Sequence, residues 1–142
     1  MFKIRPATRD DVADIALNLR SDDYREVVEG AGLNPVLSIS LSISSGSAIV
    51  FDTPDGKAAG VAGVDASGCI WMLCTDKIEQ YPIAFVRQAR RWIDSLPHKL
   101  LYNKADIRNT VHLKLLKHLG FKFLRVVPYG PNNLYFVEFV RL

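Results

Sequence analysis

The segment RNTVHLKLLKHLGFKF, residues 108–123, carries the most sharply bounded helix pattern in this chain. Asn109 is a residue type that caps helix N-termini, and Leu113 and Leu116 follow at the spacing of one helical face. Gly120 suits the left-handed position that ends a helix, and the Phe after it can fold back as a hydrophobic closure. We therefore predict a helix between these two caps, with one face packed inward.

The chain has 142 residues and is 49% hydrophobic, which is typical of one packed domain spanning 1–142. No stretch approaches the roughly 18 unbroken apolar residues of a membrane span, and MFKIRPATRDD lacks the apolar region of a secretion signal. Cys69 and Cys74 lie five positions apart on one predicted strand, so their side chains should point to opposite faces and not pair. We expect a reducing compartment and no metal site.

Charge is unevenly distributed along the chain. Residues 1–71 hold 6 Lys/Arg and 10 Asp/Glu, net −4, whereas residues 72–142 hold 12 and 5, net +7. This asymmetry favours either an anionic partner near the second half or a solvated helix face.

The other patterns alternate between strand and helix. Strand patterns, rich in alternating or continuous apolar residues, occupy 2–7, 47–52, 57–65, 69–75, 99–106, 122–127 and 134–140, and helix patterns occupy 8–21, 22–32 and 83–96. This order predicts an α/β domain around a mixed, mostly antiparallel sheet of six or seven strands, with helices on both faces.

The segment NPVLSISLSISSG, residues 34–46, is ambiguous. Its apolar residues alternate with serines, which is the period of a strand. However, Asn34 followed by Pro35 is an N-cap followed by a proline at the first helical position.

The helix over 109–120, ending in Gly-Phe, resembles the fourth-helix signature of the GCN5-related N-acetyltransferase (GNAT) superfamily, and the order of elements resembles that fold over nearly the whole chain. The resemblance implies that 35–44 is a helix. It also implies that the strands near 70–74 and 100–105 are parallel neighbours that splay apart, with the 83–95 helix crossing between them.

A narrower resemblance rests on WMLCT, YPIAFVRQARRWID, LLYNKADIRNTVHLKLLKHLGFKF and VPYGPNNLYFVEF. Together these segments are similar to a family of small GNAT-like internal virion proteins of short-tailed phages, ejected with the DNA at infection. This resemblance implies location in the virion or the host cytoplasm, and other phage virion proteins as partners.

GNAT enzymes bind acetyl-CoA along the bulged fourth strand, where backbone groups face the pantetheine arm, and at the next helix N-terminus. The resemblance places the candidate cofactor-binding residues at Leu73, Cys74, Thr75 and Asn109. The superfamily motif for this turn contains glycines that let the backbone approach the phosphates. Here TDKIEQYPIAF has no glycine, has acidic residues at Asp76 and Glu79, and has Pro82, which lacks an N–H. We therefore expect a degenerate acyl-CoA site and no cofactor.

The catalytic residues that the superfamily implies are also missing. The position of its frequent general-acid Tyr, four before the Gly, is Leu116. Five other side chains could transfer a proton or act as a nucleophile: His112, His118, Cys74, Glu79 and Asp76. We interpret them as packing, surface, loop or cap residues. No catalytic residue is assigned.

A basic face is a further possibility. Cations of the two helices in the second half could form one patch for weak, non-specific contact with nucleic acid. The resemblance to the GNAT fold implies that these helices lie on opposite sides of the splayed strands or meet only at their ends, which would split the charges. The residues concerned are Arg87, Arg90, Arg91, Lys114 and Lys117. The resemblance to the virion proteins implies a phage protein that assists assembly or genome ejection. The alternative is an active acetyl-CoA-dependent N-acetyltransferase with an atypical cofactor loop.

Overall fold

A computed structural model describes residues 2–142 of the chain. Its strands are β1 (Lys3–Pro6), β2 (Ile49–Asp52), β3 (Ala58–Val64), β4 (Ile70–Cys74), β5 (Leu101–Asp106), β6 (Lys122–Tyr129) and β7 (Leu134–Arg141). Its α-helices are α1 (Asp11–Ala16), α2 (Ser21–Arg25), α3 (Pro35–Ser44), α4 (Pro82–Asp94) and α5 (Thr110–His118). A π-helical turn spans Glu26–Gly30, and a 3-10 helix spans Asp76–Gln80.

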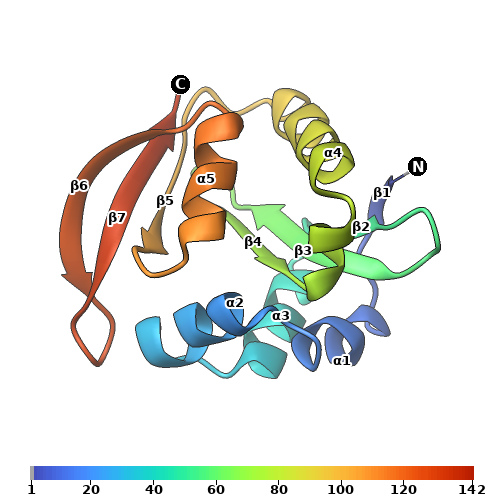
Figure 1. Ribbon diagram of the computed structural model, residues 1–142, viewed down its shortest axis with the longest axis horizontal. Coiled ribbons are helices and arrows are strands. Elements are labelled where there is room, and N and C mark those ends of the chain that lie inside the picture. Colours follow the sequence, from blue (N-terminus) through green and yellow to red (C-terminus); the bar gives the residue numbers. More distant parts are fainter. Residues whose placement is uncertain (1) are drawn as a thin grey trace.

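The strands form two antiparallel sheets, in the orders β1-β2-β3-β4 and β5-β7-β6. One parallel bridge, between Cys69 and Tyr102, joins them, and beyond it β4 and β5 diverge (Figure 1). At the divergence the Asn103 side chain donates a 2.7 Å hydrogen bond to the Ile70 carbonyl, taking the place of a backbone donor.

The α/β fold and the splayed strands agree with the sequence prediction. The prediction that 70–74 and 100–105 pair as parallel neighbours is wrong, because β4 and β5 belong to different sheets and the parallel bridge lies at Cys69 and Tyr102.

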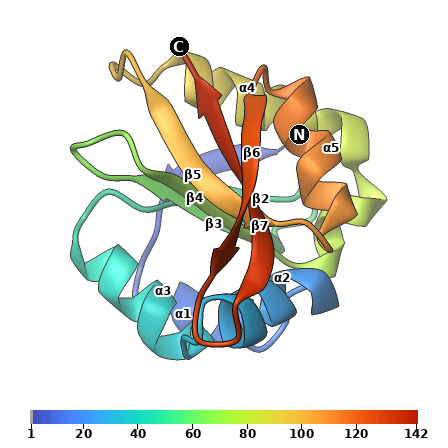
Figure 2. The same ribbon diagram turned by 90° about the vertical axis from the view of Figure 1, so that its left-hand side faces the viewer.

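Helices cover both faces of the four-stranded sheet (Figures 1 and 2). On one face α4 and α5 enclose a core around Phe51, whose ring lies 5.3 Å from that of Phe85 and 6.1 Å from that of Trp92. On the other face α1 and α3 enclose a second cluster around Ile15 and Ile39. Phe51 thus anchors α4 on the sheet.

The ambiguous segment is the helix α3. The Asn34 side chain accepts from the backbone N–H of Val36 and Leu37, and Pro35 occupies the first turn. Serine hydroxyls along the helix donate to carbonyls one turn earlier, such as Ser42 to Ser38 at 2.9 Å. Such bonds satisfy the hydroxyls but do not themselves stabilise a helix, so the Asn34 cap and Pro35 are what favour the helical form.

The helix predicted over 8–21 is shorter in the structure and ends at Ala16. The chain then becomes extended, and Leu19 forms an antiparallel bridge with Thr75 at the end of β4. A tertiary pairing therefore overrides the helical pattern.

The helix α5 begins and ends as the sequence predicts. The Asn109 side chain accepts from the backbone N–H of His112. At the other end the Phe121 N–H donates to Leu116, the Gly120 N–H donates to Lys117, and Gly120 has φ of +89°. These are the two bonds of a Schellman motif.

Over residues 2–142, no single helix is long and apolar enough to span a membrane, although the bent pair Ser21–Gly30 and Pro35–Ser44 would pass by length and composition together. The described residues hold no group of three or more His, Cys, Asp or Glu side chains that could bind a metal. Cys69 and Cys74 are unpaired, as expected.

Candidate functional site

The predicted cofactor-binding residues of β4 lie at its C-terminal end and are buried. One edge of this strand pairs with β3. On the opposite edge the Cys74 N–H donates to Asp23 Oδ2 at 2.7 Å, and the Cys74 carbonyl accepts from the Arg20 N–H at 2.9 Å. The backbone groups expected to face a pantetheine arm therefore already bond within the chain.

Three buried polar side chains fill the space beside this edge. Arg20, Asp23 and Asn109 are 5%, 3% and 1% exposed. Asp23 Oδ1 accepts from Arg20 at 3.1 Å and from the Asn109 amide at 2.7 Å. We call these three residues, with Leu19, the plug.

Asn109 is thus an internal group of the fold. Its side chain caps α5 and bonds to Asp23. The first contact caps α5 and the second lies within the plug, so Asn109 has a structural role. Its expected contact with a cofactor stays a prediction.

The other two predicted cofactor residues have structural partners as well. The Thr75 hydroxyl donates to the Ala58 carbonyl at 3.0 Å and accepts from the Lys77 N–H at 3.3 Å, which caps the 3-10 helix. Leu73 packs in the second core cluster, beneath α1 and α3.

The turn into α4 has no glycine, as read from the sequence, and forms the 3-10 helix Asp76–Gln80. Ile78 from this turn is buried, and Pro82 opens α4. No side chain caps the α4 N-terminus. A helix that starts with proline offers one fewer N–H to a phosphate.

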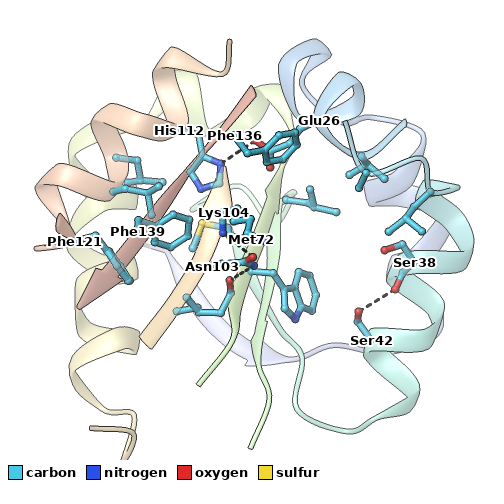
Figure 3. Close-up of a pocket in the computed structure, with 18 of the residues that line it drawn as sticks. Glu26, Ser38, Ser42, Met72, Asn103, Lys104, His112, Phe121, Phe136 and Phe139 are labelled. Carbon is cyan, nitrogen blue, oxygen red and sulfur yellow. Dashed lines mark hydrogen bonds and ion pairs between the residues drawn. The ribbon is translucent and has the colours of Figure 1, made fainter. Parts of the chain in front are cut away.

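Two hollows flank the plug. One, of about 340 Å³, lies between the splayed strands β4 and β5, and we call it the splay cavity (Figure 3). The other, of about 640 Å³, lies between α4 and α5, and we call it the interhelical groove.

The space that shares residues with both hollows has a volume of only about 10 Å³. It is lined by Arg20, Asp23 and Cys74, by Met72 and His112 of the splay cavity, and by Ile78 and Val111 of the groove, with Leu115 common to all three. Such a space is roughly the size that one water molecule needs. The space beside the plug is therefore narrower than a pantetheine arm.

Among the side chains that line the splay cavity are Glu26 and His112, two titratable residues whose proximity the sequence did not predict. Glu26 Oε1 accepts from the Asp106 N–H at 2.9 Å and lies 4.0 Å from His112 Nδ1, and the two side chains point toward one another in Figure 3. Burial raises the pKa of Glu26, while the nearby His112 opposes that shift. A carboxyl and an imidazole in this arrangement could exchange a proton with a bound ligand.

Little in the sequence identifies Glu26. It opens the π-helical turn Glu26–Gly30, a geometry often found at functional sites, and this turn follows α2 without a break. The short pattern EVVEGAG gave only a helical turn stopped by glycines.

Three other positions considered for catalysis, Cys74, Leu116 and Glu79, have structural surroundings. Burial raises the pKa of the Cys74 thiol well above its usual value, which keeps it protonated and unreactive. Leu116 is buried in the core, and the Glu79 side chain is 60% exposed and lies 3.5 Å from Arg20 Nε.

Basic residues of α4 and α5 lie closer together than the sequence predicted. Arg87, Arg90 and Lys114 all line the interhelical groove. Arg90 also donates to the His118 carbonyl at 2.6 Å, which links α4 to α5. Arg91 and Lys117 are not among the residues of the groove. The alternative that these helices lie on opposite sides of the splayed strands is therefore wrong, because residues of both line one groove.

No family model and no curated protein matches the chain. Solved structures do match. An acetyltransferase of the GNAT family from Streptococcus agalactiae superposes with a TM-score of 0.75 at 14% identity, over 99% of this chain and 95% of that one. A GCN5-related N-acetyltransferase from Kribbella flavida gives 0.68 at 20% identity, over 99% and 96%. The chain has the GNAT fold.

A third structure with this fold is a phosphinothricin acetyltransferase from Sinorhizobium meliloti in complex with AcCoA, with a TM-score of 0.70 at 15% identity over 99% of this chain and 87% of that one. At such identities the likeness establishes the fold and not the activity.

Proposed function

We propose that this GNAT-fold protein acts by binding other proteins and not by acyl transfer. The observation that carries the proposal is the pairing of Leu19 and Arg20 with the free edge of β4, which occupies the backbone groups of Cys74. Buried Arg20 and Asp23 then close the space beyond. No cofactor is expected to bind.

The biological setting we propose is that of an internal virion protein of a short-tailed phage, which assists assembly or genome ejection. Support comes from the sequence likeness of the segments from Trp71 onward. Other virion proteins would be the partners, and the protein would reside in the virion or the host cytoplasm. Phage tail and core genes beside its gene would support this setting, and metabolic genes there would count against it.

Acyl transfer is the second candidate, and the Glu26–His112 pair in the splay cavity is what favours it. A carboxyl with a raised pKa beside an imidazole suits proton removal from an amine. Acetyl-CoA would then be the cofactor. This candidate requires the plug to leave β4.

Titration calorimetry with acetyl-CoA separates the two candidates. We expect no binding tighter than about 0.1 mM, which corresponds to roughly −5.5 kcal/mol, because the Cys74 backbone groups are already bonded and the turn lacks glycines. Micromolar binding would support the acyltransferase candidate instead.

A further inference from the structure

The interhelical groove is apolar along its floor. Ile83 and Val86 of α4 and Val111 and Leu115 of α5 are among its lining residues. Ile83 is 75% exposed and Val111 is 43% exposed, although both are large aliphatic residues. Covering these side chains with a partner would remove apolar surface from water, which favours binding.

Positive charge borders this floor. Arg87, Arg90 and Lys114 line the groove, against one carboxylate among its lining residues, Glu79. Three permanent cations and one anion give a net charge of +2. The bond from Arg90 to the His118 carbonyl holds that guanidinium in place on the groove wall. The groove therefore pairs an apolar floor with a positive rim.

The dimensions of the groove suit a short helix. Its α4 wall extends from Pro82 to Arg90, which is about 12 Å at the helical rise of 1.5 Å per residue. About two turns of a partner helix would lie along it, with apolar anchors at positions i, i+4 and i+7. Acidic side chains on the flanks of that helix would meet the cations.

We propose that the interhelical groove docks an acidic amphipathic helix of a partner protein. The inference rests on the proposed function, in which no cofactor uses this side of the fold. A polyanion such as duplex DNA fits less well, because phosphates gain nothing from an apolar floor and Arg91 and Lys117 lie outside the groove. A nucleotide fits less well because α4 opens with Pro82 and has Glu79 before it.

The test is selection from a displayed library of random 16-residue peptides on the whole chain. Enriched peptides are synthesised with a fluorescent label and titrated by anisotropy. We expect acidic sequences with apolar residues at helical spacing. The double variant Arg87→Glu, Lys114→Glu should weaken their binding at least tenfold. Arg91→Glu, a reversal on an exposed residue of α4 outside the groove, should weaken it less than twofold.

Four outcomes would overturn the groove proposal: no enrichment, enriched peptides without acidic residues, equal weakening by Arg91→Glu, or duplex DNA that competes for the groove at physiological salt. Circular dichroism of each variant checks that the fold is kept. Failure of the proposed function has a different signature, because acetyl-CoA would then bind at micromolar concentration and displace the peptide. If acetyl-CoA does not bind and no peptide is enriched, only the groove proposal fails.

Discussion

The Asp23→Ala variant should lose about 3–5 kcal/mol of unfolding free energy, because it removes one partner of a buried ion pair. Arg20 is 5% exposed and would keep its charge with Asp23 gone. The Cys74 N–H and the Asn109 amide would each lose an acceptor as well. Urea unfolding followed by circular dichroism measures the loss.

Asp23→Asn is the matched control, since it keeps an acceptor oxygen and the side-chain volume while removing the charge. We expect a loss of similar size, because Arg20 again stays buried without its carboxylate and one accepting oxygen becomes an NH2 donor. A loss much smaller than that of Asp23→Ala would mean that the cavity, and not the charge, accounts for the effect. A loss below about 1 kcal/mol for Asp23→Ala would mean that the carboxylate is solvated and that the plug is not formed.

Phe51→Ala should have a comparable effect, about 3–5 kcal/mol, because it empties a fully buried aromatic site. The ring packs edge-on against Phe85 and Trp92, which belong to α4. Its removal should therefore also loosen α4, one wall of the interhelical groove. Thermal and denaturant unfolding give the stability change.

Phe51→Leu serves as the control for this site, because it retains most of the buried aliphatic volume. We expect a smaller loss, together with an unchanged near-ultraviolet signal from Trp92. If Ala and Leu at this position are equally tolerated, Phe51 does not anchor α4 as described.

Much of the fold could be predicted because its signals are local. Asn34 and Asn109 each cap a helix, and Gly120 ends one, with the contacts that their residue types favour. The alternating serines favoured a strand over 34–46, and this alternative is wrong. The period of the apolar residues carries no information about the helix cap at Asn34. The missing glycines and Pro82 in the cofactor turn were also visible as local departures.

The rest depends on contacts that are distant in sequence. The α1 helix ends early because Leu19 and Arg20 pair with a strand more than fifty residues later. Asn109 was predicted near a cofactor, and its partner Asp23 could not be foreseen, because their 86-residue separation leaves no local trace. The Glu26–His112 pair likewise needs both the π-helical turn and the position of α5.

The separation into two sheets is a similar case. The strand–helix–strand order indicates parallel neighbours, and Cys69 and Tyr102 do form one parallel bridge. The Asn103 side chain then donates a hydrogen bond to the Ile70 carbonyl, and β4 and β5 diverge. Nothing in the local pattern of β5 marks Asn103 as the residue that replaces a ladder bond.

Amide hydrogen exchange at Arg20 and Cys74 tests the plug most directly, because a pantetheine arm and the plug would compete for the same backbone groups of β4. We predict that both amides are protected in the free protein as strongly as Ala62 in the centre of β3, and that 1 mM acetyl-CoA leaves them unchanged. Exchange of both at the rate of an unstructured chain, or loss of protection at Arg20 alone when acetyl-CoA is added, would contradict a cofactor path closed by the chain itself.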